Sequence, residues 1–264
     1  MPSPLTSSAA MRRAWTRIRP HLPGWVWERA LKASGHLRHP IDATPLQTIS
    51  TLPADRVTDR EYLEKHFLPA MGLSDHGPFL FPPELAPYLG VGVQHYQLPV
   101  QFAPYLAEIA RHQVASYLEI GVEHGGTFAI TVELLRRLGP VRGIAVDLGP
   151  TPLALRRWQP PATHFVAIDS QTPDFRRRLA EWGPFDLAFI DGDHVAPAVR
   201  HDLESVRPHA RMIAVHDITE PNFPGVTQVW NEFRAEFADQ YDFHEFTDHY
   251  GSEPCLGIGL AIRR

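Results

Sequence analysis

Residues 116–127, which read SYLEIGVEHGGT, decide the fold of this 264-residue chain. The stretch begins with an apolar run typical of a buried strand, and a helical pattern starts at Thr127. Gly121 permits a tight turn between them, and Gly125 and Gly126 let the backbone approach a ligand beside free helix N–H groups. The order strand, glycine-rich turn, helix predicts a ligand-binding α/β unit, although an ordinary glycine-rich turn has the same appearance.

Apolar runs typical of strands alternate with helical patterns from this stretch to the C-terminus. The further predicted strands cover residues 143–147, 164–168, 185–190, 211–215, 241–246 and 257–262. The predicted helices cover residues 104–112, 127–138, 152–158, 173–182, 195–206 and 226–237. This alternation implies a parallel sheet with helices on both faces. We expect an α/β domain over residues 91–264, with a Rossmann-like, doubly wound, mostly parallel seven-stranded sheet.

The first ninety residues have a different composition. Ten prolines between Pro20 and Pro87 break any long element, so only short helices are predicted, at residues 25–34 and 59–66. Arginines and tryptophans between Arg12 and Arg38 could bind an anionic surface or a partner. Packing on the main domain is the simpler interpretation. We therefore predict a proline-rich helical cap or accessory region over residues 1–90.

The composition excludes several classes of protein. The net charge is −5, so there is no overall basic field to attract nucleic acid. Cys255 is the sole cysteine, which rules out an internal disulfide and a cysteine-based zinc site and favours a cytoplasmic location. No apolar run approaches the roughly 18 residues that a membrane-spanning helix needs. A homo-oligomer remains open.

Polar residues follow the first three predicted strands, where such sheets bind ligands. Glu123 stands where the dinucleotide fingerprint requires glycine, and together with Glu119 it suits a cationic, amino-acid-like ligand better than a pyrophosphate. Asp147 could accept both hydroxyls of a ribose or cap the next helix. Asp169 and Ser170 could contact an adenine edge, and helix capping is an equal alternative.

The fourth and fifth predicted strands end in the most reactive side chains. The fourth is followed by Asp191, Asp193 and His194, and the fifth ends in His216 and Asp217. Because these strands should be neighbours, Asp191, Asp217 and His216 would form a magnesium site, although turn carboxylates without a metal are an equal alternative. His194 is the candidate base, since the ordinary pKa of histidine is near 6.5, and Asp193 is the second candidate catalytic residue.

Together these motifs resemble the class I S-adenosylmethionine-dependent methyltransferases over residues 117–230. The nearest branch includes metal-dependent sugar O-methyltransferases of macrolide pathways and cephalosporin-hydroxylase-like proteins. The residues that carry the resemblance are Glu119-x-Gly121-x-x-x-Gly125-Gly126, Asp147, the run FDLAFIDGDH at residues 185–194, Asp202-Leu203, His216-Asp217, Gly225-Val226 and Trp230.

The resemblance implies methyl transfer from S-adenosylmethionine to a hydroxyl group of a small-molecule or glycan acceptor. It implies that the methionine part lies near Gly121 and Glu119, the ribose near Asp147, and the adenine near Asp169 and Ser170. The full set expected to contact the cofactor is Glu119, Gly121, Gly125, Asp147, Asp169, Ser170 and Asp191. It further implies Mg²⁺ on Asp191 and Asp217 and a base at His194. The branch carries an acidic residue where this chain has His216, so magnesium is an optional cofactor here.

Three other functions stay open on the sequence alone. A hydrolase or hydroxylase with a single metal ion would leave the turn at residues 119–126 without a purpose. A nicotinamide-dependent Rossmann oxidoreductase conflicts with Glu123, and a non-catalytic scaffold that binds S-adenosylmethionine has no need of the cluster at residues 191–194. Acceptor specificity is expected from the N-terminal region and the loop at residues 218–224. Residues 96–102 could line the substrate or methionine pocket, although a loop on the sheet edge is the simpler interpretation.

Overall fold

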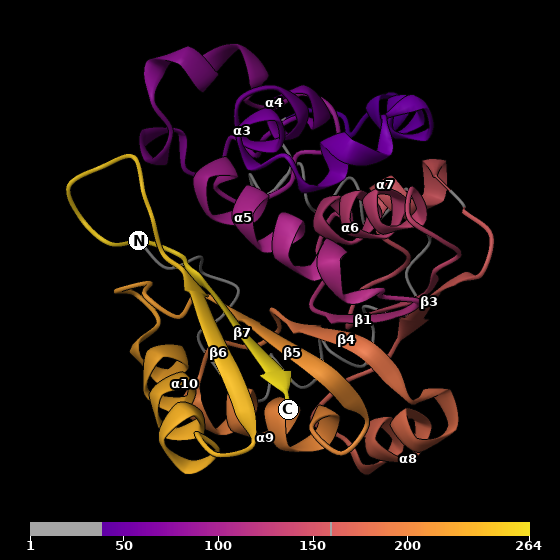
Figure 1. Cartoon of the computed structure of the whole chain (residues 1–264), viewed down its shortest axis with the longest axis vertical. Coiled ribbons are helices and arrows are strands. Elements are labelled where there is room, and N and C mark those ends of the chain that lie inside the picture. The colour runs from indigo at the N-terminus through magenta and orange to yellow at the C-terminus, as the bar shows by residue number, and fades with distance from the viewer. Residues whose placement is uncertain (1–38, 159) are drawn as a thin grey trace.

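The computed structural model describes residues 39–158 and 160–264 (Figure 1). The described residues form one seven-stranded sheet with the order β3-β2-β1-β4-β5-β7-β6. The strands are β1 Ser116–Ile120, β2 Arg142–Asp147, β3 Thr163–Ala167, β4 Phe185–Ile190, β5 Ala210–His216, β6 Tyr241–Phe246 and β7 Ile258–Arg263. All pairs are parallel except those of β7, which runs antiparallel to both β5 and β6. The predicted Rossmann-like, mostly parallel sheet is confirmed.

Helices cover both faces of the sheet. One face carries α5 Pro99–Ile109, α6 Gly126–Arg136 and α7 Leu153–Arg157, and its core contains Tyr105, Phe128 and Phe189. The other carries α8 Pro173–Trp182, α9 Ala196–Val206 and α10 Pro224–Glu236, and its core contains Phe175 and Trp230. Figure 1 shows the two layers on opposite sides of the strands. The sheet is therefore doubly wound, as its alternating sequence predicts.

The chain reverses its direction across the sheet between β1 and β4. From β1 the chain moves outward through β2 to β3, then returns to place β4 on the other side of β1. Ile120, the last residue of β1, pairs with Val146 of β2 and Ile190 of β4. Ligands of open α/β sheets bind at such a switch point, outside the carboxyl ends of the strands. The fold thus indicates where the functional site lies.

The described part of the N-terminal region packs into the same core as the sheet. Its buried residues Leu46, Ile49, Leu63 and Phe67 belong to the apolar cluster that contains Phe128 of α6. Its helical segments are short: 3-10 helices at Thr44–Thr51, Ala54–Thr58, Pro78–Leu80 and Pro83–Tyr88, α3 Arg60–Tyr62, a π turn Leu63–Phe67 and α4 Leu68–Met71. The division at residue 90 stays a prediction. The helix expected at residues 25–34 and the segment from Arg12 to Arg38 lie outside the described residues.

Two predictions about the segment before β1 need correction. Helix α5 begins at Pro99, five residues before the predicted start, and ends in a 3-10 turn at Ala110–His112. Proline at the first helical position has a suitable φ and lacks an N–H that would find no partner, so Pro99 favours this start. Residues 99–102 are thus the first turn of a buried helix and not a loop on the sheet edge.

No helix of the described residues is long and apolar enough to cross a membrane.

Candidate active site

The turn after β1 touches the end of β4. Gly121 has a φ of +82°, and a Cβ at this position would lie 2.0 Å from the carbonyl oxygen of Asp191. The Asp191 N–H donates to the Ile120 carbonyl at 2.8 Å, and the Gly121 N–H donates to the Val146 carbonyl at 2.8 Å. Only glycine satisfies both the conformation and the close approach. The glycine-rich turn and the first residue of the polar cluster are therefore in direct backbone contact.

Asp147 at the end of β2 holds the glycine-rich turn. Its Oδ2 accepts hydrogen bonds from the N–H groups of Val122 at 3.1 Å and Glu123 at 3.0 Å, and its Oδ1 accepts from Gly149 at 3.1 Å. The capping alternative is wrong, because α7 follows Pro152 and has no side-chain cap. A carboxylate offers about four lone-pair sites, so these three bonds leave limited capacity for a ribose. Asp147 shapes the turn whatever else it contacts.

A segment just before α5 lies against the start of α6. Gly125 caps this helix with a φ of +84°, and a Cβ on Gly126 would lie 2.9 Å from the Val93 carbonyl oxygen and 3.2 Å from the Cα of His95. Sequence analysis missed this contact, because nothing in residues 93–95 resembles a ligand-binding motif. The helix start expected to face the cofactor is thus partly covered by residues near the start of the predicted domain.

Glu119 lies in the core of the sheet. Its side chain is almost fully buried and accepts a hydrogen bond from the Tyr117 hydroxyl. Burial raises the pKa of Glu119 well above its ordinary value, and the nearby carboxylates of Asp191 and Asp147 add to this rise. Burial thus favours the protonated form of this acid. The prediction that Glu119 attracts a cationic amino group stays a prediction.

The loop after β3 is joined to a buried acid on α9. Asp169 Oδ1 accepts from the Gln171 N–H at 2.9 Å, and the cap of α8 is Thr172, so neither Asp169 nor Ser170 caps this helix. The Gln171 amide donates to Ser170 Oγ at 3.2 Å and to Asp202 Oδ1 at 2.8 Å.

Sequence analysis used Asp202 only as part of a motif. Its side chain is fully buried, and Oδ2 has no hydrogen-bond partner among the described residues. Burial raises the pKa of Asp202 to about 7. A Cβ on Gly192 would lie 3.4 Å from this Oδ2, so the buried acid lies directly behind the loop that follows β4.

Four side chains from the ends of β4 and β5 meet at the switch point, because these strands are neighbours as predicted. His216 Nδ1 lies 3.1 Å from Asp191 Oδ1 and 3.2 Å from Asp217 Oδ1. His194 Nε2 lies 2.9 Å from Asp217 Oδ2 and 3.6 Å from Asp191 Oδ1. We call these four residues the His–Asp cluster. Asp193 lies outside it, exposed to solvent, and its Oδ1 accepts from the Val195 N–H at 3.2 Å.

The His–Asp cluster neutralises its own charge. Burial by itself lowers the pKa of His194, but hydrogen bonds and attraction from Asp191 and Asp217 outweigh it and raise this pKa to about 10. For His216 the same two carboxylates outweigh burial and raise the pKa to about 9. Burial raises the pKa of Asp191, but His216 and His194 more than offset this and hold it below its ordinary value. Both imidazoles are cationic at neutral pH, which corrects the expectation of a histidine poised near 6.5.

The cluster also fits a divalent cation. Asp191, His194 and Asp217 offer ligand atoms that all lie within 4.8 Å of one another. Asp217 Oδ1 and His194 Nε2 are buried atoms with no well-oriented hydrogen bond among the described residues. Buried polar atoms in that state are expensive unless a further partner satisfies them. The geometry thus groups Asp191 and Asp217 with His194, whereas the sequence predicted His216 as the third ligand.

Aromatic side chains border the cluster on two sides. The ring of Phe223, from the loop before α10, stacks on His194 with centroids 4.1 Å apart. Tyr96, from the segment before α5, packs edge-on against His76 with ring centroids 6.4 Å apart. Burial and the nearby charges of Asp217 and Glu123 raise the pKa of Tyr96 to about 12, so the phenol keeps its proton. Of the segment 96–102, Tyr96 is therefore the residue beside the site.

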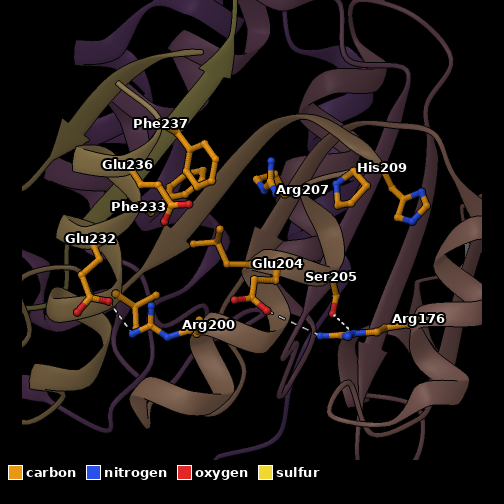
Figure 2. A pocket seen from close by; sticks show the side chains of 13 residues that line it. Arg176, Arg200, Glu204, Ser205, Arg207, His209, Glu232, Phe233, Glu236 and Phe237 are labelled. Atoms are coloured by element: carbon orange, nitrogen blue, oxygen red, sulfur yellow. Dashed lines mark hydrogen bonds and ion pairs between the residues drawn. The ribbon is translucent and has the colours of Figure 1, made fainter. Parts of the chain in front are cut away.

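A separate cavity of about 480 Å³ lies between α8, α9 and α10 (Figure 2). Its lining includes Arg207 and His209, which precede β5, so it lies toward the amino end of that strand and away from the His–Asp cluster. Figure 2 shows the ion pair between Arg200 and Glu232 at its edge. The cavity is therefore separate from the candidate active site.

Residues 118–218 match the family model described as a methyltransferase domain. The predicted resemblance is thereby confirmed for the part of the chain that carries the glycine-rich turn and the His–Asp cluster. No curated protein matches the sequence.

Several solved structures align with part or most of this chain. MycE, a methyltransferase of the mycinamycin pathway in complex with Mg, S-adenosylhomocysteine and mycinamycin VI, is 16% identical over 61% of this chain and 49% of its own, with a TM-score of 0.45. The O-methyltransferase of Bacillus cereus in complex with S-adenosylhomocysteine is 14% identical over 95% and 99%, with a TM-score of 0.48. TomG of Streptomyces achromogenes, an O-methyltransferase of tomaymycin synthesis, is 18% identical over 59% and 76%, with a TM-score of 0.45. The chain spans about half the length of MycE.

Proposed function

We propose that this protein transfers a methyl group from S-adenosylmethionine to a hydroxyl group of a small-molecule or sugar acceptor. The observation that carries the proposal is the contact between Gly121 and Asp191, where a Cβ would meet a carbonyl oxygen at 2.0 Å. It joins the turn expected to hold the cofactor to the cluster expected to act on the acceptor. The match of residues 118–218 to a methyltransferase domain supports the same reading.

The cofactor is assigned to the carboxyl ends of β1, β2 and β3. In this assignment the methionine part lies along the turn at Gly121 and Gly125, and the ribose lies beside Asp147 at the end of β2. The adenine lies beside Asp169 and Ser170. A cationic sulfonium is compatible with the acidic side chains that surround this end of the sheet, whereas a pyrophosphate would be repelled.

The His–Asp cluster is assigned to the acceptor. The acceptor oxygen attacks the methyl carbon in line with the carbon–sulfur bond, the oxygen–carbon bond forms, and S-adenosylhomocysteine leaves. The hydroxyl proton passes to His194 Nε2, which must first release the proton that Asp191 and Asp217 stabilise there. A divalent cation on Asp191, His216 and Asp217 would supply a Lewis acid for the hydroxyl and weaken the hold of both carboxylates on that proton. Phe223 fixes the plane of His194 by stacking on it.

The two alternatives explain less. A nicotinamide-dependent oxidoreductase needs the glycine-rich dinucleotide fingerprint, which Glu123 interrupts. The dinucleotide-binding fold also has the strand order 3-2-1-4-5-6, whereas this sheet has the antiparallel strand β7 between β5 and β6. A non-catalytic scaffold leaves the buried, partly unpartnered polar atoms of Asp217 and His194 without a purpose. Methyl transfer gives each of these features a role.

The test is an acceptor screen with S-[methyl-¹³C]adenosylmethionine, read by mass spectrometry and carbon NMR. The panel pairs each hydroxylated compound with the analogue in which an amine replaces that hydroxyl. We expect label on oxygen, and a loss of at least about 100-fold in kcat for His194→Ala. The control is His164→Ala, which removes an exposed imidazole on β3. Label on nitrogen would overturn O-specificity, and full activity in His194→Ala would overturn the role of that residue.

A further inference from the structure

We propose that the edge strand β6 pairs with β6 of a second copy of this chain, so that two sheets join across a twofold axis at Phe243. Among the described residues, β6 is the last strand on its side of the sheet, and it lies beside α10 (Figure 1). An open strand edge offers its N–H and C=O groups to another strand. The inference goes beyond the proposed function and does not depend on methyl transfer.

The edge of β6 lacks proline, lysine and a bulge, three features that commonly protect an open strand. Its six residues, Tyr241–Phe246, read YDFHEF. They face the residues of β7 in one unbroken register, so no bulge bends the edge away. The strand at the opposite edge, β3, is shorter and follows Pro160 and Pro161. Strand β6 is therefore the edge better suited to pairing with another chain.

The ladder with β7 decides which backbone groups of β6 face outward. The Arg264 N–H donates to the Gln240 carbonyl at 3.0 Å, so these two facing residues form a hydrogen-bonded pair. Hydrogen-bonded and non-hydrogen-bonded pairs alternate along antiparallel strands. The even-numbered residues of β6 therefore bond to β7, and the backbone groups of Tyr241, Phe243 and Glu245 point to the open edge.

These outward groups fit one register with a second copy. The Tyr241 N–H already donates to the Phe237 carbonyl at 3.1 Å, which leaves the N–H groups of Phe243 and Glu245 free for a new strand. With the axis at Phe243, this residue faces its own copy, and Glu245 faces Tyr241 of the second copy, so both N–H groups meet a carbonyl. An axis at Glu245 would set two glutamates opposite each other, which is unfavourable. The register centred on Phe243 is therefore preferred.

The same register places complementary side chains opposite each other. Asp242 faces His244 of the second copy, and the twofold axis repeats this pair. Facing residues that exchange no backbone hydrogen bonds lie closest, with about 4.5 Å between Cα atoms. Asp242 Oδ1 accepts from Arg264 Nε at 2.8 Å, and the carboxylate has a second oxygen for the imidazole N–H. Asp242 is exposed and His244 is half-buried, so both can reach a partner.

A groove beside β6 leaves room for the second copy. It holds about 820 Å³ between α10 and the open strand. Ala235 of α10 and Ala238 just after it line the groove, and their short, exposed side chains allow a close approach. Phe243 lines it as well, and its ring would meet the ring of its own copy across the axis. The edge thus combines a free backbone, a complementary pair and a hollow that a second copy can fill.

The experiment measures the mass of the purified full chain by sedimentation velocity, from about 1 µM to about 100 µM. We expect a dimer with a Kd of the order of 10 µM. Asp242→His sets imidazoles opposite each other and His244→Asp sets carboxylates there, so each should raise this Kd at least about fivefold. The double variant restores the complementary pairs and should return the Kd to within about twofold of the wild type. Glu181→Gln, an exposed control on α8, should change nothing.

Hydrogen exchange resolved by residue tests the register. The amides of Phe243 and Glu245 should exchange fast in the dilute monomer and slowly in the dimer, whereas the His244 amide, which faces β7, should be slow in both. A chain that stays monomeric at about 100 µM would overturn the proposal. So would a dimer in which the first two amides exchange fast, a double variant that does not recover, or protection that persists on dilution because the chain covers its own edge. Because methyl transfer is not measured, failure here is distinguishable from failure of the proposed function.

Discussion

Replacement of Asp202 by asparagine should stabilise the protein at neutral pH, because this buried carboxyl is costly to ionise. Burial raises its pKa from 3.8 to about 7 in the folded state. The folded protein then binds more protons than the unfolded chain between these values, so stability falls as pH rises from about 4 to about 7. At about 1.4 kcal/mol per pKa unit, the loss above pH 7 reaches at most about 4 kcal/mol.

Asparagine keeps the shape and the hydrogen bond of Asp202. Its side-chain oxygen can still accept from the Gln171 amide, which lies 2.8 Å from Asp202 Oδ1, and it carries no charge. Denaturant unfolding of the wild type, Asp202→Asn and the exposed control Asp239→Asn should be compared at pH 4, 5, 6, 7 and 8. The expected gain for Asp202→Asn is near zero at pH 4 and grows through pH 7, with no such trend in the control. A variant less stable than the wild type at pH 8, or a gain independent of pH, would refute the reasoning.

Three further predictions concern the site. Gly121→Ala should lower the free energy of unfolding by at least about 3 kcal/mol, because the new Cβ would lie 2.0 Å from the Asp191 carbonyl oxygen and the residue has a φ of +82°. A loss under about 1 kcal/mol, measured by denaturant unfolding, would contradict this close contact. Asp147→Ala should lower the free energy of unfolding by about 1–3 kcal/mol. Hydrogen exchange at the amides of Val122 and Glu123 should become faster, because both amides lose the carboxylate oxygen that accepts their hydrogen bonds. Exchange that stays slow in this variant would show that Asp147 does not hold the glycine-rich turn. The pKa of His216, about 9, means that an ion must displace its proton, so Mn²⁺ affinity should fall about tenfold per pH unit from pH 8 to 6; a flat profile would contradict this.

The fold was predictable because its signals are local and periodic. The boundaries of β1, β4 and α8 agree with the sequence patterns, since apolar runs and helical stripes with clear end signals specify these elements. The start of α5 was not predictable in the same way. Pro104 suggested a helix start, yet Pro99 precedes it and also suits the first turn, and tertiary burial of the whole segment decides between the two.

The candidate site was predictable as a set of residues but not as a network. Adjacent strand ends brought Asp191, His194, His216 and Asp217 together, as parallel strand order requires. Their charge states were not readable, because they depend on distances between side chains from different strands. The use of Asp147 to hold the glycine-rich turn depends likewise on contacts between segments that are far apart in the sequence.

The contribution of the segment before α5 was only partly visible in the sequence. Val93 and His95 lie against Gly126 without belonging to a recognisable pattern, whereas Tyr96 belongs to the segment predicted as possible pocket lining and lies near enough to Asp217 for that charge to raise the pKa of its phenol. Such residues act through shape and position, which a single sequence does not encode in residue type alone. Acceptor specificity is the property expected to depend most on them.

Isothermal titration of the purified chain with S-adenosylhomocysteine, and in parallel with NADH, tests the central claim most directly. We predict a Kd for S-adenosylhomocysteine of the order of micromolar, about −8 kcal/mol, and no heat with NADH. Binding should be lost in Gly121→Ala and retained in the exposed control Asp239→Asn. Folded protein that gives no heat with S-adenosylhomocysteine, or that binds NADH in its place, would contradict the assignment of this domain to methyl transfer.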